Sequence, residues 1–185
     1  MPELLLEILS EEIPARMQSK AADDFKRITS RGLNEAGLEF SSAESYVTPR
    51  RLTLVVYGLP VQKSDVMEER KGPRTDAPAQ AINGFKRSLP EEAVIEERRS
   101  PKGGVLFATW EEPGRSTRDV LVNCLPKIFQ DLPWPKSMRW ANHDLRWVRP
   151  IHSLLVIFDG QPVPFQFGPV MAGNETRGHR FLSFD

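Results

Sequence analysis

The sequence predicts an α+β fold: a mixed or antiparallel sheet with helices on one face, plus a polar insertion containing a short helix and a hairpin. Two segments repeat their apolar residues at helical spacing, and several short runs rich in β-branched and aromatic residues are typical of strands. Sixteen prolines and twelve glycines, spread over 185 residues, indicate many turns and short strands rather than a helix bundle. An apolar content of 39% and a charged content of 27% are those of an ordinary globular domain.

The first predicted element is a buried strand over residues 3–9, because this run is short, apolar and followed by a helix start. Ser10 is the expected N-cap of the helix that follows. The apolar face of that helix repeats at intervals of four, four and three residues, at Met17, Ala21, Phe25 and Ile28.

A second strand is expected at residues 51–59, and the chain then changes character. Residues 60–90 are polar and contain four prolines, with a short helix expected around 78–88. Two strands joined by a Pro-Lys-Gly-Gly turn follow. We interpret residues 63–113 as an insertion or subdomain in a core formed by residues 1–62 and 114–185.

The last predicted elements are a helix and a hairpin. Ser116 and Asp119 have the spacing of a capping box, and the helix they begin runs to about residue 131. Residues 153–167 form the clearest hairpin of the chain, with Asp159-Gly160 at its turn. The resulting order places two helices over one face of a sheet.

The sequence contains no recognisable catalytic pattern. Its glycines form neither a dinucleotide-binding motif nor a phosphate loop, and no Ser, His and Asp combination has the context of a nucleophile elbow. The carboxylate pairs Glu11-Glu12 and Glu91-Glu92 lack a neighbouring group that would give one carboxylate an acid role and the other a base role. We therefore expect no catalytic residue in this chain.

A metal-dependent phosphohydrolase is the weakest alternative. The dipeptide His143-Asp144 suggests it, with His152, His179 and Asp159 as further ligands. The spacing of the histidines does not match a zinc site, and the residues fall on predicted loops and strands. The expectation is that the chain binds no metal.

Cysteine content and hydropathy predict a soluble, cytoplasmic protein without a membrane partner. The single cysteine, Cys124, excludes an internal disulfide and is expected to be a buried small apolar residue. No apolar run approaches the roughly 20 residues that span a bilayer, and the N-terminus lacks the features of a signal peptide.

The strongest functional signal is a concentration of basic and aromatic residues. The net charge is zero, yet residues 136–180 carry +3 while residues 1–48 carry −4. Arginine binds phosphate through paired hydrogen bonds, and Trp140 or Trp147 could stack on RNA bases. The alternative is that the dipeptides Arg139-Trp140 and Arg146-Trp147 are packing pairs beside a hairpin, or part of a subunit interface.

Six stretches in order along the chain carry a family resemblance: ELLLEILSEEIPAR (3–16), TPRRLTLVVYGL (48–59), KGP (71–73), LPWPKSMRW (132–140), LRWVRPIHSLL (145–155) and TRGHRFL (176–182). Together they resemble the N-terminal region of the β subunit of bacterial heterotetrameric (α2β2) glycyl-tRNA synthetase. One departure is Leu9-Ser10, where the family often has Gly-Thr. The family's β subunit is considerably longer, and its later HD-like and anticodon-binding domains are absent here.

The resemblance implies a non-catalytic part of a glycine–tRNA ligase, whose α subunit uses ATP and Mg²⁺ while this part binds no cofactor. The implied partners are the α subunit, the remainder of the β subunit and tRNA(Gly). An alternative is a pure protein–protein assembly module without RNA contact, in which Trp134, Trp140 and Trp147 are interface anchors. The candidate RNA- or subunit-contact residues are Arg50, Arg51, Lys136, Arg139, Trp140, Arg146, Arg149, Arg177, His179 and Arg180.

Overall fold

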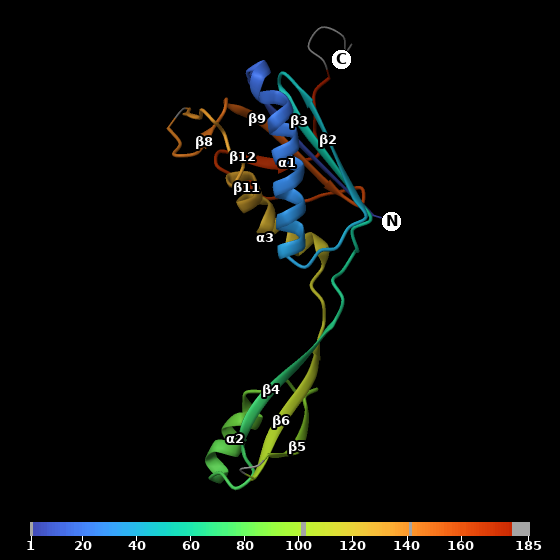
Figure 1. Cartoon of the computed structure of the whole chain (residues 1–185), viewed down its shortest axis with the longest axis vertical. Helices are drawn as coiled ribbons and strands as arrows, with labels where there is room; N and C mark the ends of the chain where they lie inside the picture. The colour runs from blue at the N-terminus through green and yellow to red at the C-terminus, as the bar shows by residue number, and fades with distance from the viewer. Residues whose placement is uncertain (1, 101–102, 141, 179–185) are drawn as a thin grey trace. The chain divides into compact units, whose positions relative to one another are not determined.

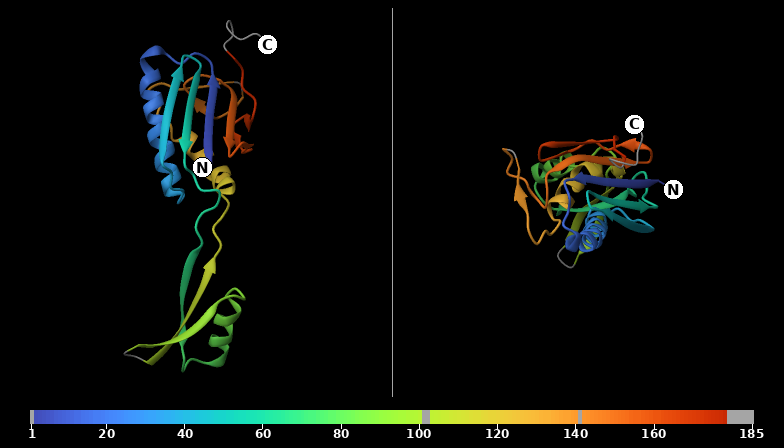
Figure 2. Two further views of the ribbon diagram at one scale, coloured as in Figure 1. Left: turned by 90° about the vertical axis from the view of Figure 1, so that its right-hand side faces the viewer. Right: turned by 90° about the horizontal axis from the view of Figure 1, so that it is seen from above.

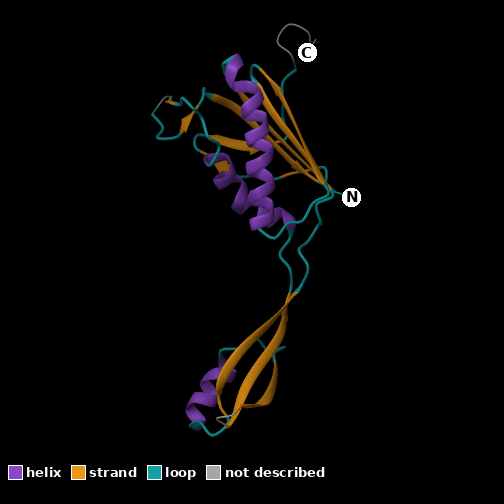
Figure 3. Ribbon diagram, viewed as in Figure 1, coloured by secondary structure: helices purple, strands orange, loops and turns teal. Residues whose placement is uncertain are grey.

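The computed structural model describes residues 2–100, 103–140 and 142–178, and the chain divides into two compact units. Unit 1 consists of residues 1–63 and 115–185, and unit 2 of residues 64–114. Each unit combines strands with at least one helix, which confirms the predicted α+β class (Figures 1 and 3).

Unit 1 is built on a seven-stranded sheet with the order β11-β12-β9-β1-β3-β2, and β10 pairs with β9. All neighbours are antiparallel except β12 and β9, and Figure 2 shows the long strands side by side. The elements of this unit are β1 (Glu3–Ser10), α1 (Ala15–Glu35), β2 (Ser42–Thr48), β3 (Arg51–Tyr57), α3 (Thr117–Gln130), β7 (Met138–Arg139), β8 (Arg146–Trp147), β9 (Ile151–Phe158), β10 (Gln161–Pro162), β11 (Gln166–Phe167) and β12 (Val170–Gly173).

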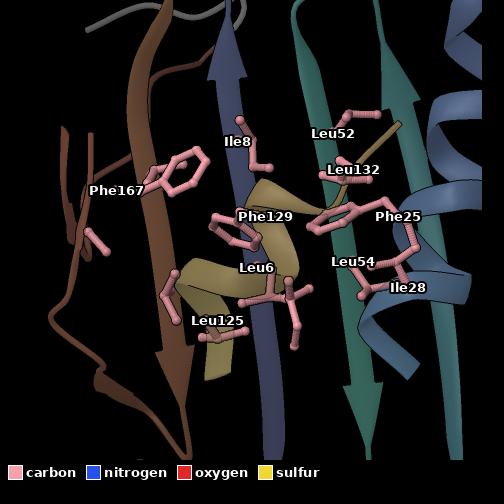
Figure 4. Close-up of a cluster of buried hydrophobic side chains, with 14 of the residues drawn as sticks. Leu6, Ile8, Phe25, Ile28, Leu52, Leu54, Leu125, Phe129, Leu132 and Phe167 are labelled. Carbon is pink, nitrogen blue, oxygen red and sulfur yellow. The ribbon is translucent and has the colours of Figure 1, made fainter. Parts of the chain in front are cut away.

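The core of unit 1 lies between this sheet and the two helices α1 and α3, which cover one face as predicted (Figure 4). Alternate residues of the central strands, such as Leu6 and Leu54, are fully buried on that face. Phe129 of α3 lies at the centre. Its ring makes edge-to-face contacts with Phe25, Phe165 and Phe167, at centroid distances of 5.9, 5.7 and 5.6 Å. These contacts join both helices to the sheet.

The start of α1 differs from the prediction. Ser10 is the last residue of β1, where it pairs with Ile151, so the sheet uses the residue that was expected to cap the helix. The helix begins at Ala15 with Pro14 in the N-cap position, and Pro14 makes no side-chain cap. The predicted apolar face is confirmed, since all four of its residues are buried: Met17, Ala21, Phe25 and Ile28.

Unit 2 has a three-stranded sheet of order β4-β6-β5 and one helix. Its elements are β4 (Val66–Arg74), α2 (Ala79–Arg87), β5 (Val94–Ser100) and β6 (Gly103–Glu112). The predicted helix and the β5–β6 hairpin are confirmed, although the residues of the expected turn at 101 and 102 lie outside the described part of the chain. The strand β4 was not predicted.

Further predictions at the C-terminal side of the chain are confirmed. The Ser116 hydroxyl accepts the backbone N–H of Asp119 at 3.1 Å and caps α3. Asp159 and Gly160 both have positive φ, 49° and 72°, as a two-residue turn between β9 and β10 requires. No helix in the described ranges is long and apolar enough to cross a membrane.

Unit 2 separates the two parts of unit 1 in the sequence, and the ends of those two parts are joined to each other by backbone hydrogen bonds. The N–H of Lys63 donates to the carbonyl of Arg115 at 3.0 Å, and the N–H of Thr117 donates to the carbonyl of Val61 at 2.9 Å. We call these two paired segments, residues 61–63 and 115–117, the boundary pair.

Candidate functional site

Three segments that lie far apart in the sequence meet at one end of the unit 1 sheet. The N–H of Ser10 donates to the Arg50 carbonyl at 2.8 Å, and the N–H of Ile13 donates to the Pro49 carbonyl at 2.6 Å. The N–H of Glu11 donates to the Pro150 carbonyl at 2.9 Å. The end of β1, the β2–β3 turn and the start of β9 are thereby fixed to one another. Three of the six stretches that carry the family resemblance thus form one place in the structure.

Charged side chains gather at this junction, and we call Glu7, Glu11, Arg50, Arg51 and His152 the sheet-end cluster. His152 Nε2 lies 2.6 Å from Glu11 Oε1, and Arg50 Nη2 lies 3.4 Å from each of these two atoms. Arg50 Nε also donates to the Ser10 carbonyl at 3.2 Å. These three side chains are 30–48% exposed, so their ion pairs contribute little stability and serve mainly to fix geometry.

Glu7 and Arg51 lie deeper, on the face of the sheet opposite the helices. Glu7 is 8% exposed, and its Oε2 lies 3.5 Å from Arg51 Nε. The Thr176 hydroxyl donates to Glu7 Oε1, and Arg51 Nη2 donates to the Arg177 carbonyl. The segment after β12 is therefore attached to the two central strands. Because Arg50 and Arg51 each have a carboxylate partner in this chain, part of their charge is already neutralised.

The short hairpin of β7 and β8 carries a second basic group, and we call Lys136, Arg139, Trp140 and Arg146 the basic hairpin. Arg139 is directly opposite Arg146 in the strand register, an arrangement of like charges that destabilises a strand pair. Asp144, which is 99% exposed, lies 3.3 Å from Arg139. Arg146 Nε and Nη2 donate to the hydroxyl and the carbonyl of Ser137, both at 3.3 Å. Neither contact removes the net positive charge.

Lys136 adds a further charge to the basic hairpin. Its side chain is exposed, and within the described ranges it makes no hydrogen bond or ion pair. The basic hairpin therefore gathers three cationic side chains and has one carboxylate partner, Asp144, among the described residues.

The tryptophans of the 132–147 region belong largely to the core. Trp147 is 1% exposed, and its ring packs edge-on against Trp134 and Phe167 at centroid distances of 5.2 and 5.6 Å. The interpretations of Trp147 as a stacking face for RNA or as an interface anchor are therefore wrong, since its own core covers it. Trp140 is partly buried against the same core.

The remaining predicted contact residues are scattered. Arg149 is half-buried and its Nη1 donates to the Val148 carbonyl at 2.8 Å, whereas the side chain of Arg177 is exposed. His179 and Arg180 lie outside the described residues. Glu7 and Thr176 were not among the predicted site residues; their only signal in the sequence is that both lie within the stretches that carry the family resemblance.

The part of the chain that the structure describes contains no group of three or more His, Cys, Asp or Glu side chains that could hold a metal ion. Of the ligands considered for the metal-site alternative, His152 lies in the sheet-end cluster and His143 is exposed on the loop between β7 and β8.

The comparison with known proteins places the chain in one family. A family model described as glycyl-tRNA synthetase beta subunit matches residues 4–185. The chain belongs to this family of aminoacyl-tRNA synthetase subunits.

Curated relatives named glycine–tRNA ligase beta subunit agree with this assignment. The protein from Dinoroseobacter shibae is 49% identical over 99% of this chain and 26% of its own length. The relative from Paracoccus denitrificans is 48% identical over 100% of the chain and 28% of its length, and the one from Rhodospirillum centenum is 45% identical over 100% and 30%. The chain thus spans between a quarter and a third of the length of these relatives.

Proposed function

We propose that this chain is the N-terminal part of the β subunit of a glycine–tRNA ligase, in which it supports tRNA(Gly) binding and the assembly of the α and β subunits. It supplies no catalytic residue to the ATP-dependent glycylation of tRNA(Gly) and binds no cofactor itself. ATP and Mg²⁺ bind the α subunit. The family match, the names of the relatives and the distribution of basic side chains in unit 1 support this proposal.

The observation that carries the tRNA contact is the cross-strand pair of Arg139 and Arg146. Two like-charged residues directly opposite each other in a strand pair destabilise the pair, and an anion near both would offset the repulsion. A phosphodiester supplies such an anion, because its oxygens accept paired hydrogen bonds from arginine. Lys136 extends the positive surface, and Trp140, whose ring is partly buried, follows Arg139 directly in the sequence.

The sheet-end cluster has a supporting role in this proposal. Its arginines, Arg50 and Arg51, already pair with carboxylates of the same chain. Arg50 pairs with Glu11, whose backbone N–H donates to the Pro150 carbonyl, and the Pro150 segment leads directly from the basic hairpin into β9. Arg50 and Arg51 therefore position the RNA-binding surface and contribute less of its charge than the basic hairpin.

The test measures binding of labelled tRNA(Gly) to the assembled α and full-length β subunits across a salt series. Arg139→Ala and Arg146→Ala should each reduce the slope of log K against log salt by about 1, because each removes one phosphate contact. The matched control is Arg31→Ala, since Arg31 is an exposed arginine on α1 with a partner at i+4, Glu35, at 3.5 Å. It should leave the slope unchanged.

An unchanged slope in both hairpin variants would contradict the tRNA contact. If the same variants then weakened the association of α with β, the basic hairpin would bind carboxylates of a protein surface, as in the assembly-module alternative. If neither affinity changed, the basic hairpin would have no part in either function.

A further inference from the structure

Unit 2 presents a groove on its three-stranded sheet. The register pairs Met67 of β4 with Glu111 of β6, and Val94 of β5 with Thr109 of β6, so these four side chains share one face. They line the groove together with residues from the segments that flank the strands, and no α2 residue is among its lining. We call this feature the acidic groove.

The acidic groove contains exposed apolar side chains. Met67 is 68% exposed and Val94 is 58% exposed. Trp110 also contributes to the lining. Single exposed apolar residues are normal, but a group of them gathered in a groove marks an interaction surface.

Three carboxylates line the same groove: Asp65, Glu92 and Glu111. Asp65 Oδ1 accepts the backbone N–H of Gly114 at 2.7 Å. Within the described ranges, no basic side chain forms an ion pair with Glu92 or Glu111. The groove therefore has unpaired negative charge beside apolar surface.

Elsewhere on the same face, carboxylates are paired. Arg98 Nη2 lies 2.7 Å from Glu69 and 3.9 Å from Glu96, and its guanidinium stacks over the Phe107 ring at 4.7 Å. Arg98 is a cation whose side chain also covers apolar surface. Among the described residues, the carboxylates of the acidic groove have no such partner.

We propose that the acidic groove of unit 2 binds a segment of the α subunit that presents an arginine or lysine next to an apolar side chain. The cation lies against Glu92 and Glu111, and the apolar side chain covers Met67 and Val94. A tRNA backbone does not fit, because each phosphate about 4 Å from a carboxylate is repelled by about 1 kcal/mol even in water. This inference rests on the proposed function, which supplies the α subunit as a partner.

The test uses full-length β and the α subunit, with two affinities measured on each variant: β for α, and the assembled ligase for labelled tRNA(Gly). Glu92→Lys/Glu111→Lys reverses the charge of the groove. The matched control is Glu91→Lys/Glu112→Lys, which makes the same change in net charge at the adjacent exposed carboxylates, outside the lining. Hydrogen exchange of the β4, β5 and β6 amides verifies that unit 2 remains folded in both variants.

The groove variant should weaken the binding of β to α at least tenfold, whereas the control should leave it within twofold. A milder variant, Met67→Ser, should weaken the same affinity without altering net charge. Equal α affinity for the groove variant, the control and the parent would overturn the inference. A loss of tRNA affinity in the groove variant with its affinity for α unchanged would overturn it as well, by showing an RNA contact. Neither result bears on the salt slope of the basic hairpin variants, so the proposed function is tested separately.

Discussion

The contact between α1 and α3 allows a stability prediction whose sign depends on one neighbour. Gly32 lies in α1, and a Cβ added there would be 2.5 Å from Cγ1 and 2.6 Å from Cδ1 of Ile128 in α3. Carbon atoms in good contact are separated by about 3.5–4.0 Å, so these atoms must move. Ile128 is 4% exposed and packed in the core, which leaves it little room.

The expected magnitude follows from two opposing terms. Replacing glycine by alanine within a helix gains about 1 kcal/mol, whereas overpacking a filled core costs about 1–3 kcal/mol. Gly32→Ala should therefore lower the free energy of unfolding of unit 1 by about 1 kcal/mol. In an Ile128→Ala background the obstructing atoms are gone, and the same substitution should raise the free energy of unfolding by about 1 kcal/mol. The coupling between the two positions is then about 2 kcal/mol.

Urea unfolding followed by tryptophan fluorescence measures this cycle. Of the four tryptophans, only Trp110 belongs to unit 2, so a Trp110→Phe background makes the signal specific for unit 1. Gly84 in α2 is a control of the same residue type, because nothing lies within 4 Å of an added Cβ. Gly84→Ala should increase the protection of the α2 amides in hydrogen exchange. An equal effect of Gly32→Ala in both Ile128 backgrounds would refute the reasoning.

Three further predictions concern titration, reactivity and modularity. The hydrogen bond from Arg27 holds the pKa of Asp24 below its usual value, so this carboxylate stabilises the fold above about pH 4 and loses that effect as the pH falls through its folded pKa. Asp24→Asn should therefore flatten the acid side of a plot of urea midpoint against pH. A plot identical to that of the parent would contradict this. Burial raises the pKa of Cys124 to about 11, so alkylation at pH 8 should be about 100-fold slower in the folded protein than in denaturant, and similar rates would show that the thiol is accessible. Replacing residues 64–114 by a short Gly-Ser linker should leave the urea midpoint of unit 1 unchanged, because the boundary pair already holds the two ends together; a large drop would show that unit 1 needs unit 2.

Elements with a strong local pattern were predictable from the sequence. The apolar period of α1, the cap of α3 at Ser116 and the Asp159-Gly160 turn depend on residues within a few positions of one another. The strand β4 was missed because its sequence, VMEERKGPR, has charged residues on both faces and lacks the alternation that marks a half-buried strand. Only pairing with β6 makes it a strand.

The candidate site was predictable in composition but not in arrangement. The basic residues of the hairpin were selected for their charge, yet their cross-strand opposition depends on a register that the sequence does not specify. The contacts of the sheet-end cluster join residues as far apart as Glu7 and Thr176, which no local pattern connects. Trp147 was misjudged because its neighbours Arg146 and Arg149 suggested a surface, while Phe167 and Trp134 cover its ring.

The position of β1 between β3 and β9 has a consequence for synthesis on the ribosome. One partner of β1, the strand β3, is complete at Tyr57, but the other, β9, begins only at Ile151. One edge of β1 is therefore unpaired while residues 58–150 are made. At typical elongation rates this takes on the order of 10 s. During that interval the contiguous residues of unit 2 are complete and free to fold, while an apolar strand edge of unit 1 is open to pairing with other nascent chains. The β1 edge is covered only when β9 emerges, and β10, β11 and β12 then complete that side of the sheet.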